Sequence, residues 1–258
     1  MNYEKLDFKI PEQSEDYDEC SAFVTTSIES IMKDAIDAGQ NKIIINTSLK
    51  LGLPMENINK IAGPFVEAWA VEIFQDVLED ANNRYSLINV EAKERLYMAD
   101  IILQFQKKRK QESGVTAEVD VKATSEDIES SGKSPNITSF KRIRTAYIKD
   151  PDYIFIILSL KHRVYSIKNQ VTGLMDGIME VVAYNAYDIK YLSSSDISYN
   201  PALGSGQLQI RDIHYVTLAK KNTWEFCQLI DKKFIGSKKG FEGWLELAKT
   251  NEWIKNYE

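Results

Sequence analysis

The sequence contains only two cysteines and two histidines among its 258 residues. Cys20 and Cys227 lie far apart and lack the short spacing of metal ligands, which argues against a disulfide scaffold and favours a reduced, cytosolic protein. We expect His162 and His214 to be structural or surface residues. A zinc site or a histidine-based catalytic site therefore has little to be built from.

Long apolar runs are also missing. No stretch approaches the roughly 20 apolar residues of a membrane-spanning helix, and Met1–Lys5 lacks the basic region and apolar core of a signal peptide. We therefore expect a cytoplasmic protein without membrane contact. Hydrophobic residues make up 43% of the chain, which suits an ordinary globular core. No linker or internal repeat is evident, so we predict a single domain over residues 1–258.

Positive charge is scarce in the first part of the chain. Residues 1–100 contain 9 Lys and Arg against 19 Asp and Glu, whereas residues 101–258 contain 23 against 19. The net charge of −6 argues against a globally basic protein, but phosphate binding needs only a locally basic surface. Some basic clusters are expected to be solubilising surface residues. The clusters are residues 107–110, 141–144, 161–163, 232–233 and 238–239.

Apolar periodicity predicts alternating helices and strands, and hence an α/β (α+β) fold. Helices are expected over residues 21–38, 64–78, 136–148, 173–191, 222–230 and 240–257. Strands are expected over residues 42–46, 85–90, 100–105, 116–123, 153–160 and 208–216. The unbroken apolar run at 153–160 indicates a strand that is buried on both faces. In the helix at 136–148, Lys141, Arg142 and Arg144 are predicted to be exposed, and Trp224, Trp244 and Trp253 are predicted to pack in the core.

Two acids and a lysine occur at the start of one predicted strand and within the next. Asp100 opens the first strand, and Asp120 and Lys122 lie two residues apart in the second. Side chains alternate faces along a strand, so Asp120 and Lys122 should point the same way. Antiparallel pairing of the two strands would bring Asp100 beside Asp120. Two carboxylates and an ammonium group arranged in this way can hold a divalent cation together with a phosphodiester.

Two other interpretations of this motif remain open from the residues alone. An Asp-x-Lys pair on a strand is common by chance, and by itself it more often marks a solvent-exposed face. Glu118 lies two residues before Asp120, so it shares the same predicted face and competes for the same role.

The pattern resembles the signature of PD-(D/E)xK restriction-type endonucleases, an acid followed by Asp/Glu-x-Lys on the next strand. The resemblance extends to Met98–Leu103 and to Ser134–Ile137 followed by Ser139, in the order found in EcoRV/HincII-like type II restriction endonucleases. Ala99 stands where the motif has proline. Weaker similarity covers two further segments, residues 63–67 and 200–212.

The resemblance implies an αβββαβ core with a central mixed sheet flanked by helices, at residues 60–165. Residues 166–258 would form an appended DNA-reading region. A prokaryotic enzyme that uses Mg²⁺, which Mn²⁺ could replace, is implied, and no nucleotide cofactor is expected. Cleavage by such an enzyme would leave 5′-phosphate and 3′-hydroxyl ends.

The resemblance also suggests a role for each residue of the motif. Asp100, Asp120 and the Val121 carbonyl would be metal ligands, and Lys122 would contact the attacking water and a phosphate oxygen. The acid of the signature precedes the lysine by two residues, which favours Asp120 over Glu118. On the preceding helix, Glu67 is a candidate accessory acid. Glu72 is its competitor, and either could instead be an exposed helix carboxylate.

Asparagine and glutamine can form two hydrogen bonds with adenine in the major groove. By resemblance, Asn136 is a base-contacting residue, and Lys133 falls near the position of an intercalating glutamine. Asn136 could also cap the helix expected after Pro135. The other predicted DNA-binding residues are Ser134, Ser139, Asn200, Gln207 and Gln209.

We therefore predict a homodimeric type II restriction endonuclease that cuts both strands of a short palindrome in double-stranded DNA. A two-fold protein matches the two-fold symmetry of such a site. The apolar segment 173–191 is a possible dimer surface, or else a buried core helix. A repair or junction-resolving nuclease on the same core is the alternative. A DNA-binding module without activity is a second one, against which the intact Asp100, Asp120 and Lys122 argue.

Overall fold

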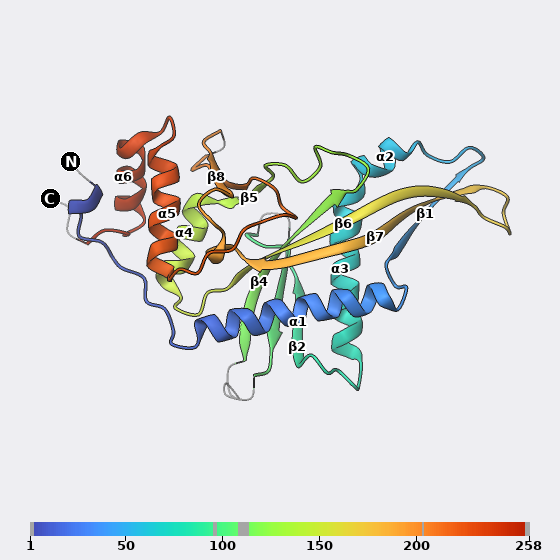
Figure 1. Cartoon of the computed structure of the whole chain (residues 1–258), viewed down its shortest axis with the longest axis horizontal. Coiled ribbons are helices and arrows are strands. Elements are labelled where there is room, and N and C mark those ends of the chain that lie inside the picture. The colour runs from blue at the N-terminus through green and yellow to red at the C-terminus, as the bar shows by residue number, and fades with distance from the viewer. Residues whose placement is uncertain (1–2, 95–96, 108–113, 203, 256–258) are drawn as a thin grey trace. The chain divides into compact units, whose positions relative to one another are not determined.

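The chain divides into two compact units. The large-sheet unit comprises residues 22–132 and 156–187, and the small-sheet unit comprises residues 1–21, 133–155 and 188–258. The computed structural model (Figure 1) describes residues 3–94, 97–107, 114–202 and 204–255 of the sequence. Whether the two units together form one domain stays a prediction.

A mixed sheet of six strands, in the order β1-β7-β6-β4-β3-β2, forms the core of the large-sheet unit. The pairs β1–β7, β2–β3 and β3–β4 are antiparallel. The central strand β6 begins with six buried residues, Phe155–Leu160, which confirms that this strand is buried on both faces. The strands are β1 Lys42–Leu49, β2 Leu87–Ala92, β3 Ile101–Phe105, β4 Val115–Ser125, β6 Phe155–Lys168 and β7 Met175–Asp188.

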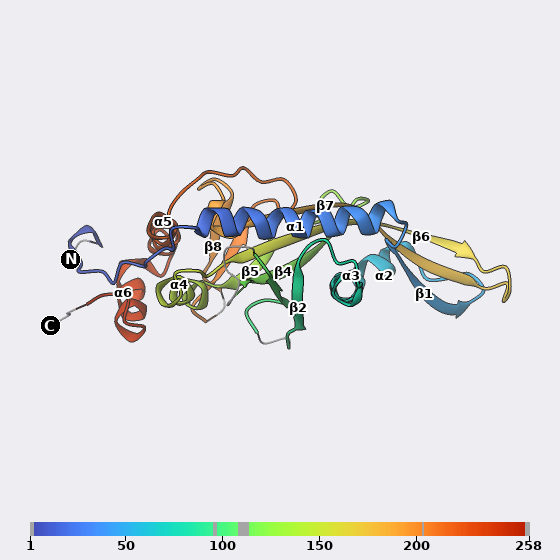
Figure 2. The ribbon, with the colours of Figure 1, turned by 90° about the horizontal axis from the view of Figure 1, so that it is seen from below.

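Three helices flank this sheet (Figure 2): α1 Tyr17–Asp37, α2 Met55–Lys60 and α3 Ala62–Glu79. Helix α3 buries Val66, Ala70 and Phe74, which recur at four-residue intervals and form one apolar face. This face packs against β4 and β2. The packing fixes the side chains of α3 relative to β4, the strand that carries Asp120 and Lys122.

The small-sheet unit contains a three-stranded sheet in the order β5-β9-β8. Phe140 packs edge-on against Tyr199 and Trp253, at ring distances of 5.8 and 5.6 Å, so aromatic residues join the sheet to the closing helices. The elements are β5 Asn136–Ser139, α4 Phe140–Lys149, β8 Ile197–Asn200, β9 Gln207–Ile210, α5 Thr223–Ile235 and α6 Gly240–Thr250, with short 3-10 helices at Tyr3–Lys5 and Ile189–Tyr191.

A buried ion pair corrects one prediction in this unit. Arg144 was expected on the exposed side of its helix, but its side chain is fully buried and binds Asp231, which is also fully buried. Its guanidinium group lies over the rings of Trp224 and Trp253. The charge partner lies 87 positions away in the sequence, so the local pattern of α4 did not reveal this burial.

The predicted α/β (α+β) class is confirmed, and so is the order helix, three strands, helix, strand, given by α3, β2 to β4, α4 and β6, with the short strand β5 of the other sheet inserted before α4. Trp244 and Trp253 are buried as predicted, whereas Trp224 is half-buried. Within the described residues, no helix combines the length and apolarity of a membrane span.

Three element predictions differ from the structure. The helix expected over residues 173–191 is strand β7, which pairs with β1 in the interior of the large sheet, so it cannot be a helical dimer surface. The helix expected to begin at residue 136 begins at Phe140, because Asn136 and Ser139 pair with β9. Asn136 is therefore a strand residue and not a helix cap. The strand expected over 208–216 ends at Ile210.

Candidate active site

Asp100 lies just before β3 and is fixed against both neighbouring strands. Its N–H donates to the Val119 carbonyl at 3.0 Å, and its Oδ2 accepts a hydrogen bond from the Val121 N–H at 2.7 Å. Its own carbonyl accepts a hydrogen bond from the Lys93 N–H at 2.8 Å. Because Ile101 pairs with Val119, the antiparallel register brings Asp100 beside Asp120, as the sequence predicted.

Asp120 and Lys122 form a close pair on one face of β4. The Lys122 ammonium lies 2.7 Å from both Asp120 oxygens, but hydrogen-bond geometry is met at Oδ1. Oδ2 is buried without a hydrogen-bond partner in the described part of the chain. Only 4% of Asp120 is exposed, so it lies inside the protein and not at the solvent edge of the strand.

Burial and the neighbouring opposite charges shift the pKa of each residue of this pair in opposite directions. Burial raises the pKa of Asp120 to about 7, although the neighbouring Lys122 opposes the rise. For Lys122, burial lowers the pKa, but the attraction of Asp120, Asp100 and Glu67 outweighs it and the net shift is upward. The ammonium group is therefore held in its charged form by the acids around it.

Glu67 projects from α3 towards the same charges. Burial raises its pKa, the negative charge of Asp100 raises it further, and Lys122 lowers it. These interactions place Glu67 within electrostatic reach of Asp100 and Lys122. Glu72, its competitor from the sequence, is exposed. The geometry therefore favours Glu67 as the acid that accompanies Asp100 and Asp120.

The donor atoms suit a hard divalent cation. Asp100, Asp120 and the Val121 carbonyl offer oxygen, and the buried Asp120 Oδ2, although 2.7 Å from the Lys122 ammonium, accepts no hydrogen bond in the described part of the chain. Among the described residues, no group of three or more His, Cys, Asp and Glu side chains is placed to hold a metal. Mg²⁺ typically uses only one or two carboxylates, with water and substrate phosphate as further ligands, so the smaller set still fits it.

Five predicted DNA-binding residues lie together on the three-stranded sheet. Asn136 pairs with Gln209 across β5 and β9, while Gln207 of β9 pairs with Ser139 on one side and Asn200 on the other. The Asn200 Nδ2 donates to the Asn136 Oδ1 at 3.4 Å. The fold thus pairs two segments, near residues 136 and 207, that lie far apart in the sequence.

Lys133 and Ser134 precede this sheet. The Ser134 carbonyl accepts a hydrogen bond from Gln209 Nε2 at 2.9 Å, and Ser134 has a positive φ of 51°. Lys133 forms an ion pair with Asp212, and the two residues also form an isolated antiparallel β-bridge. The role of Asp212 as the partner of Lys133 was not predicted, since no local signal links residues 79 positions apart.

Sequence comparison decides the family. The profile of the family described as type II restriction endonuclease HpaI matches residues 4–252. The chain belongs to this family. It is similar to the type II restriction enzyme HpaI of Haemophilus parainfluenzae, with 58% identity over 257 residues, covering 99% of this chain and 100% of the relative.

Membership of the HpaI family confirms the predicted enzyme class, a restriction endonuclease and thus a hydrolase that acts as a nuclease. A solved NlaIV restriction endonuclease is a distant structural match, with 14% identity, a TM-score of 0.39, and coverage of 77% of this chain and 78% of that one. The PD-(D/E)xK subgroup and the roles of the individual residues stay predictions for this HpaI-family chain.

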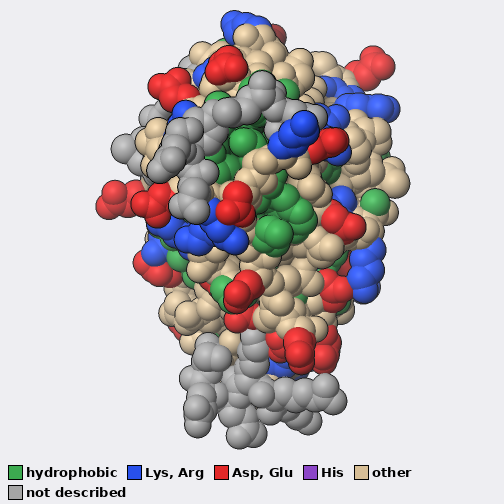
Figure 3. All heavy atoms as spheres, turned by 90° about the vertical axis from the view of Figure 1, so that its left-hand side faces the viewer, with side chains coloured by type: hydrophobic (Ala, Val, Ile, Leu, Met, Phe, Trp, Pro, Cys, Tyr) green, Lys and Arg blue, Asp and Glu red, His purple; other side chains and the backbone are tan. Residues whose placement is uncertain are grey.

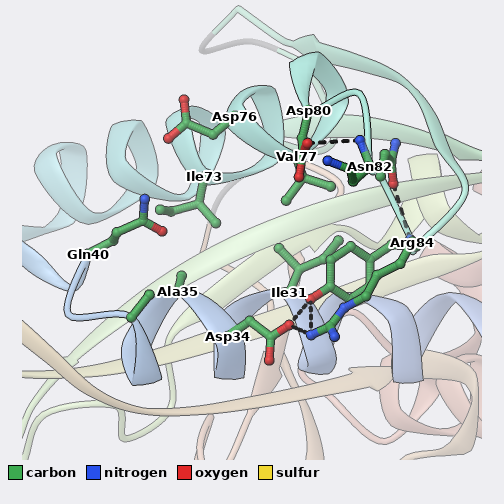
Figure 4. Close-up of a pocket in the computed structure, with 13 residues that line it drawn as sticks. Ile31, Asp34, Ala35, Gln40, Ile73, Asp76, Val77, Asp80, Asn82 and Arg84 are labelled. Atoms are coloured by element: carbon green, nitrogen blue, oxygen red, sulfur yellow. Dashed lines mark hydrogen bonds and ion pairs between the residues drawn. The ribbon is translucent and has the colours of Figure 1, made fainter.

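A pocket of 360 Å³ in the large-sheet unit is separate from the candidate site of this HpaI-family chain (Figure 4). It lies between the C-terminal halves of α1 and α3 and the segment that follows α3, and no predicted site residue lines it. Asp34, one of its acids, already accepts hydrogen bonds from Arg84 and Tyr85. Asp34, Arg84 and Tyr85 of the pocket are thus engaged with each other.

On the face drawn in Figure 3, lysine and arginine side chains are interspersed with acidic ones. Lys141 and Arg142 are exposed, but Arg144 is buried, and Arg163 is paired with Glu180. Residues 108–110 lie outside the described residues. A DNA-binding surface in this HpaI-family member therefore has to be argued from individual residues and not from overall charge.

Proposed function

We propose that the chain is a type II site-specific deoxyribonuclease that hydrolyses phosphodiester bonds in both strands of a short palindromic DNA site, with Mg²⁺, leaving 5′-phosphates. The observation that carries this proposal is the convergence of Asp100, Asp120, Lys122 and Glu67 around the start of β3 and the middle of β4. Membership of a restriction endonuclease family supports it. The cytoplasm of a prokaryote is the proposed location.

Asp100, Asp120 and the Val121 carbonyl are proposed to hold the Mg²⁺ ion. Asp100 is pre-oriented, because its Oδ2 is fixed by the Val121 N–H while Oδ1 takes no part in that bond. When bound, the ion supplies positive charge for the phosphate and lowers the pKa of an attached water. It would also favour the ionised form of Asp120, whose pKa is raised by burial.

Lys122 is proposed to orient the attacking water and to stabilise the charge that develops on the phosphate oxygens. Its ammonium group is anchored by Asp120 and is mostly buried, with a side chain that is 22% exposed. A positioned cation in a poorly hydrated site costs little reorganisation when the reaction occurs. Glu67 is proposed to act as an accessory acid that helps to position the water or the cation.

Reading of the DNA sequence is proposed for the three-stranded sheet. Asn136, Asn200, Gln207 and Gln209 present amides on neighbouring strands, and such side chains can bind adenine by two hydrogen bonds each. Ser134 and Ser139 are proposed to contact the DNA backbone. Lys133 would reach the DNA by exchanging its ion pair with Asp212 for a phosphate or a base.

The chain is proposed to act as a homodimer. One set of Asp100, Asp120 and Lys122 can cut one strand, whereas a palindrome presents two equivalent phosphates related by a two-fold axis. A second copy related by the same symmetry supplies the second site.

Metal dependence is the first expected result. Because the proposed ligands are hard oxygen atoms, cleavage should stop in EDTA and recover when Mg²⁺ or Mn²⁺ is added in excess. The measurement is agarose electrophoresis of a plasmid after incubation with the purified chain. Undiminished cleavage in chelator would show that the acids have another role.

Asn136→Ala should reduce discrimination between the correct base pair and a changed one by about 1–3 kcal/mol, because one pair of base hydrogen bonds is lost. Non-specific DNA binding should remain close to that of the wild type. The ratio of binding constants for matched and mismatched duplexes gives the measurement.

Asn136→Asp is the control for a purely structural effect. It retains an oxygen that can accept the hydrogen bond from Asn200, but it loses the amide donor that adenine requires. If Asn136→Asp discriminated between bases as well as the wild type, the side chain would serve the sheet and not the DNA.

A further inference from the structure

Strand β1 leaves the backbone of the six-stranded sheet open along one edge. The Val181 N–H donates to the Asn41 carbonyl at 2.8 Å, so Asn41 and Val181 form a hydrogen-bonded pair just before the strand. Hydrogen-bonded and non-hydrogen-bonded pairs alternate in an antiparallel ladder. The backbone N–H and C=O groups of Lys42, Ile44 and Asn46 therefore point away from β7, where the sheet ends within the described residues.

This edge carries Lys42 at its start and a register shift after Asn46, but its middle has neither a charge nor a proline. Residues 43–45 are three consecutive isoleucines without proline, and Ile44 is 65% exposed. The opposite edge, β2, instead carries Glu91, which is paired with Lys93. A long, apolar and uncovered edge strand is a template for pairing with another strand.

Exposed apolar side chains gather on the same part of the large-sheet unit. Leu51 and Val171 are 94% and 95% exposed, and they lie in the turns that follow β1 and β6 (Figure 1). Exposed apolar residues can contribute to an interaction surface. Further exposed apolar side chains of the large-sheet unit are Ile44, Leu49, Met55, Ile61, Phe65 and Ile167.

We propose that β1 is the dimer contact of this protein, and that it pairs in antiparallel fashion with β1 of a second copy about a two-fold axis at Ile44. The proposal rests on the homodimer proposed above and names its surface. The three open positions are symmetric about Ile44, so Ile44 meets Ile44 of the second copy. Each copy's Lys42 then lies opposite Asn46 of the other copy.

Side-chain charge also fits a second copy of this chain. The register places no like charges directly opposite each other, which would be unfavourable between strands. Asn46 pairs with Asp176 on β7, so each Lys42 approaches the part of the other copy's sheet that carries Asp176. The contact is isologous, which gives the closed pair that a palindromic site requires.

The test introduces charged side chains at the proposed symmetry axis. Ile44→Lys and Ile44→Glu each place like charges opposite each other, so each variant alone should be monomeric, with a dimer dissociation constant raised at least about 100-fold. An equimolar mixture should recover the dimer, because Lys then faces Glu. Light scattering at micromolar concentration should report twice the chain mass of 29.5 kDa for the wild type and the mixture.

Ile88→Lys and Ile88→Glu are matched controls, since Ile88 is 48% exposed on the opposite edge strand, and both should stay dimeric. Circular dichroism should show the wild-type fold in all four variants. A monomeric wild type, dimeric Ile44 variants, or a mixture that stays monomeric would each overturn the proposal.

Plasmid cleavage separates this proposal from the proposed function. The two Ile44 variants alone should nick the plasmid, and their mixture should linearise it. A wild type that dimerises through Ile44 but leaves DNA intact would refute the nuclease assignment and keep the interface. A wild type that cuts DNA with Ile44 variants that remain dimers would refute the interface and keep the nuclease.

Discussion

Asp120→Ala and Lys122→Ala are each expected to lower the rate of DNA cleavage by a factor on the order of 10³ or more, because electrostatic stabilisation of the reacting phosphate is a large part of such catalysis. Removal of Asp120 deletes a buried carboxylate that lies 2.7 Å from the Lys122 ammonium, and leaves that ammonium without its ion-pair partner. Removal of Lys122 deletes the cation that the surrounding acids hold in place. Single-turnover cleavage of a duplex with one site measures both losses.

Glu118→Gln is the matched control for these two variants. Glu118 lies two residues before Asp120, and its carboxylate accepts a hydrogen bond from the Tyr97 hydroxyl at 3.1 Å. We expect cleavage within about tenfold of the wild type, since an amide oxygen can still accept that bond. A Glu118→Gln variant as inactive as Asp120→Ala, or a near-native Lys122→Ala, would show that the roles along β4 are assigned to the wrong residues.

Asp231→Ala is expected to destabilise the small-sheet unit by about 3–5 kcal/mol, the usual cost of leaving a buried charge without its partner. Arg144 donates to both Asp231 oxygens at 3.1–3.2 Å, and the Tyr3 hydroxyl donates to Oδ2 at 2.8 Å. Denaturant unfolding followed by tryptophan fluorescence measures the loss, because Trp224, Trp244 and Trp253 all belong to this unit.

Asp37→Ala tests whether the loss comes from burial. Asp37 pairs with Lys33, and both side chains are 60% exposed, so its removal should change the unfolding free energy by less than about 1 kcal/mol. The double variant Arg144→Met with Asp231→Leu should recover most of the lost stability, because no charge remains buried. Asp231→Ala with wild-type stability would contradict the proposed role of the ion pair.

The acidic site was largely predictable because its determinants are local. Asp120 and Lys122 share a strand face by simple alternation, and the apolar runs around them fixed the pairing that brings Asp100 alongside. The choice between Glu67 and Glu72 could not be made from the local sequence. It depends on which turn of α3 approaches β4, and only the packing of Val66, Ala70 and Phe74 decides that.

The misread elements have physical causes as well. Residues 175–188 form a strand between β1 and β6, and most of them are apolar, so periodicity alone does not distinguish this strand from a buried helix. Residues 136–139 are extended because β9 supplies their partners from about 70 positions away. The burial of Arg144 likewise depends on Asp231, which no pattern within α4 could reveal.

The positions at which the two strands of a DNA duplex are cut test the proposed function most directly. The ends produced by the purified chain from a sequenced plasmid, with Mg²⁺ present, should be mapped on both strands. Every cut should fall within one short palindromic sequence, at positions related by its two-fold axis, with a 5′-phosphate at each end. Cuts scattered without a common sequence, or breaks confined to one strand, would contradict a homodimeric type II restriction endonuclease.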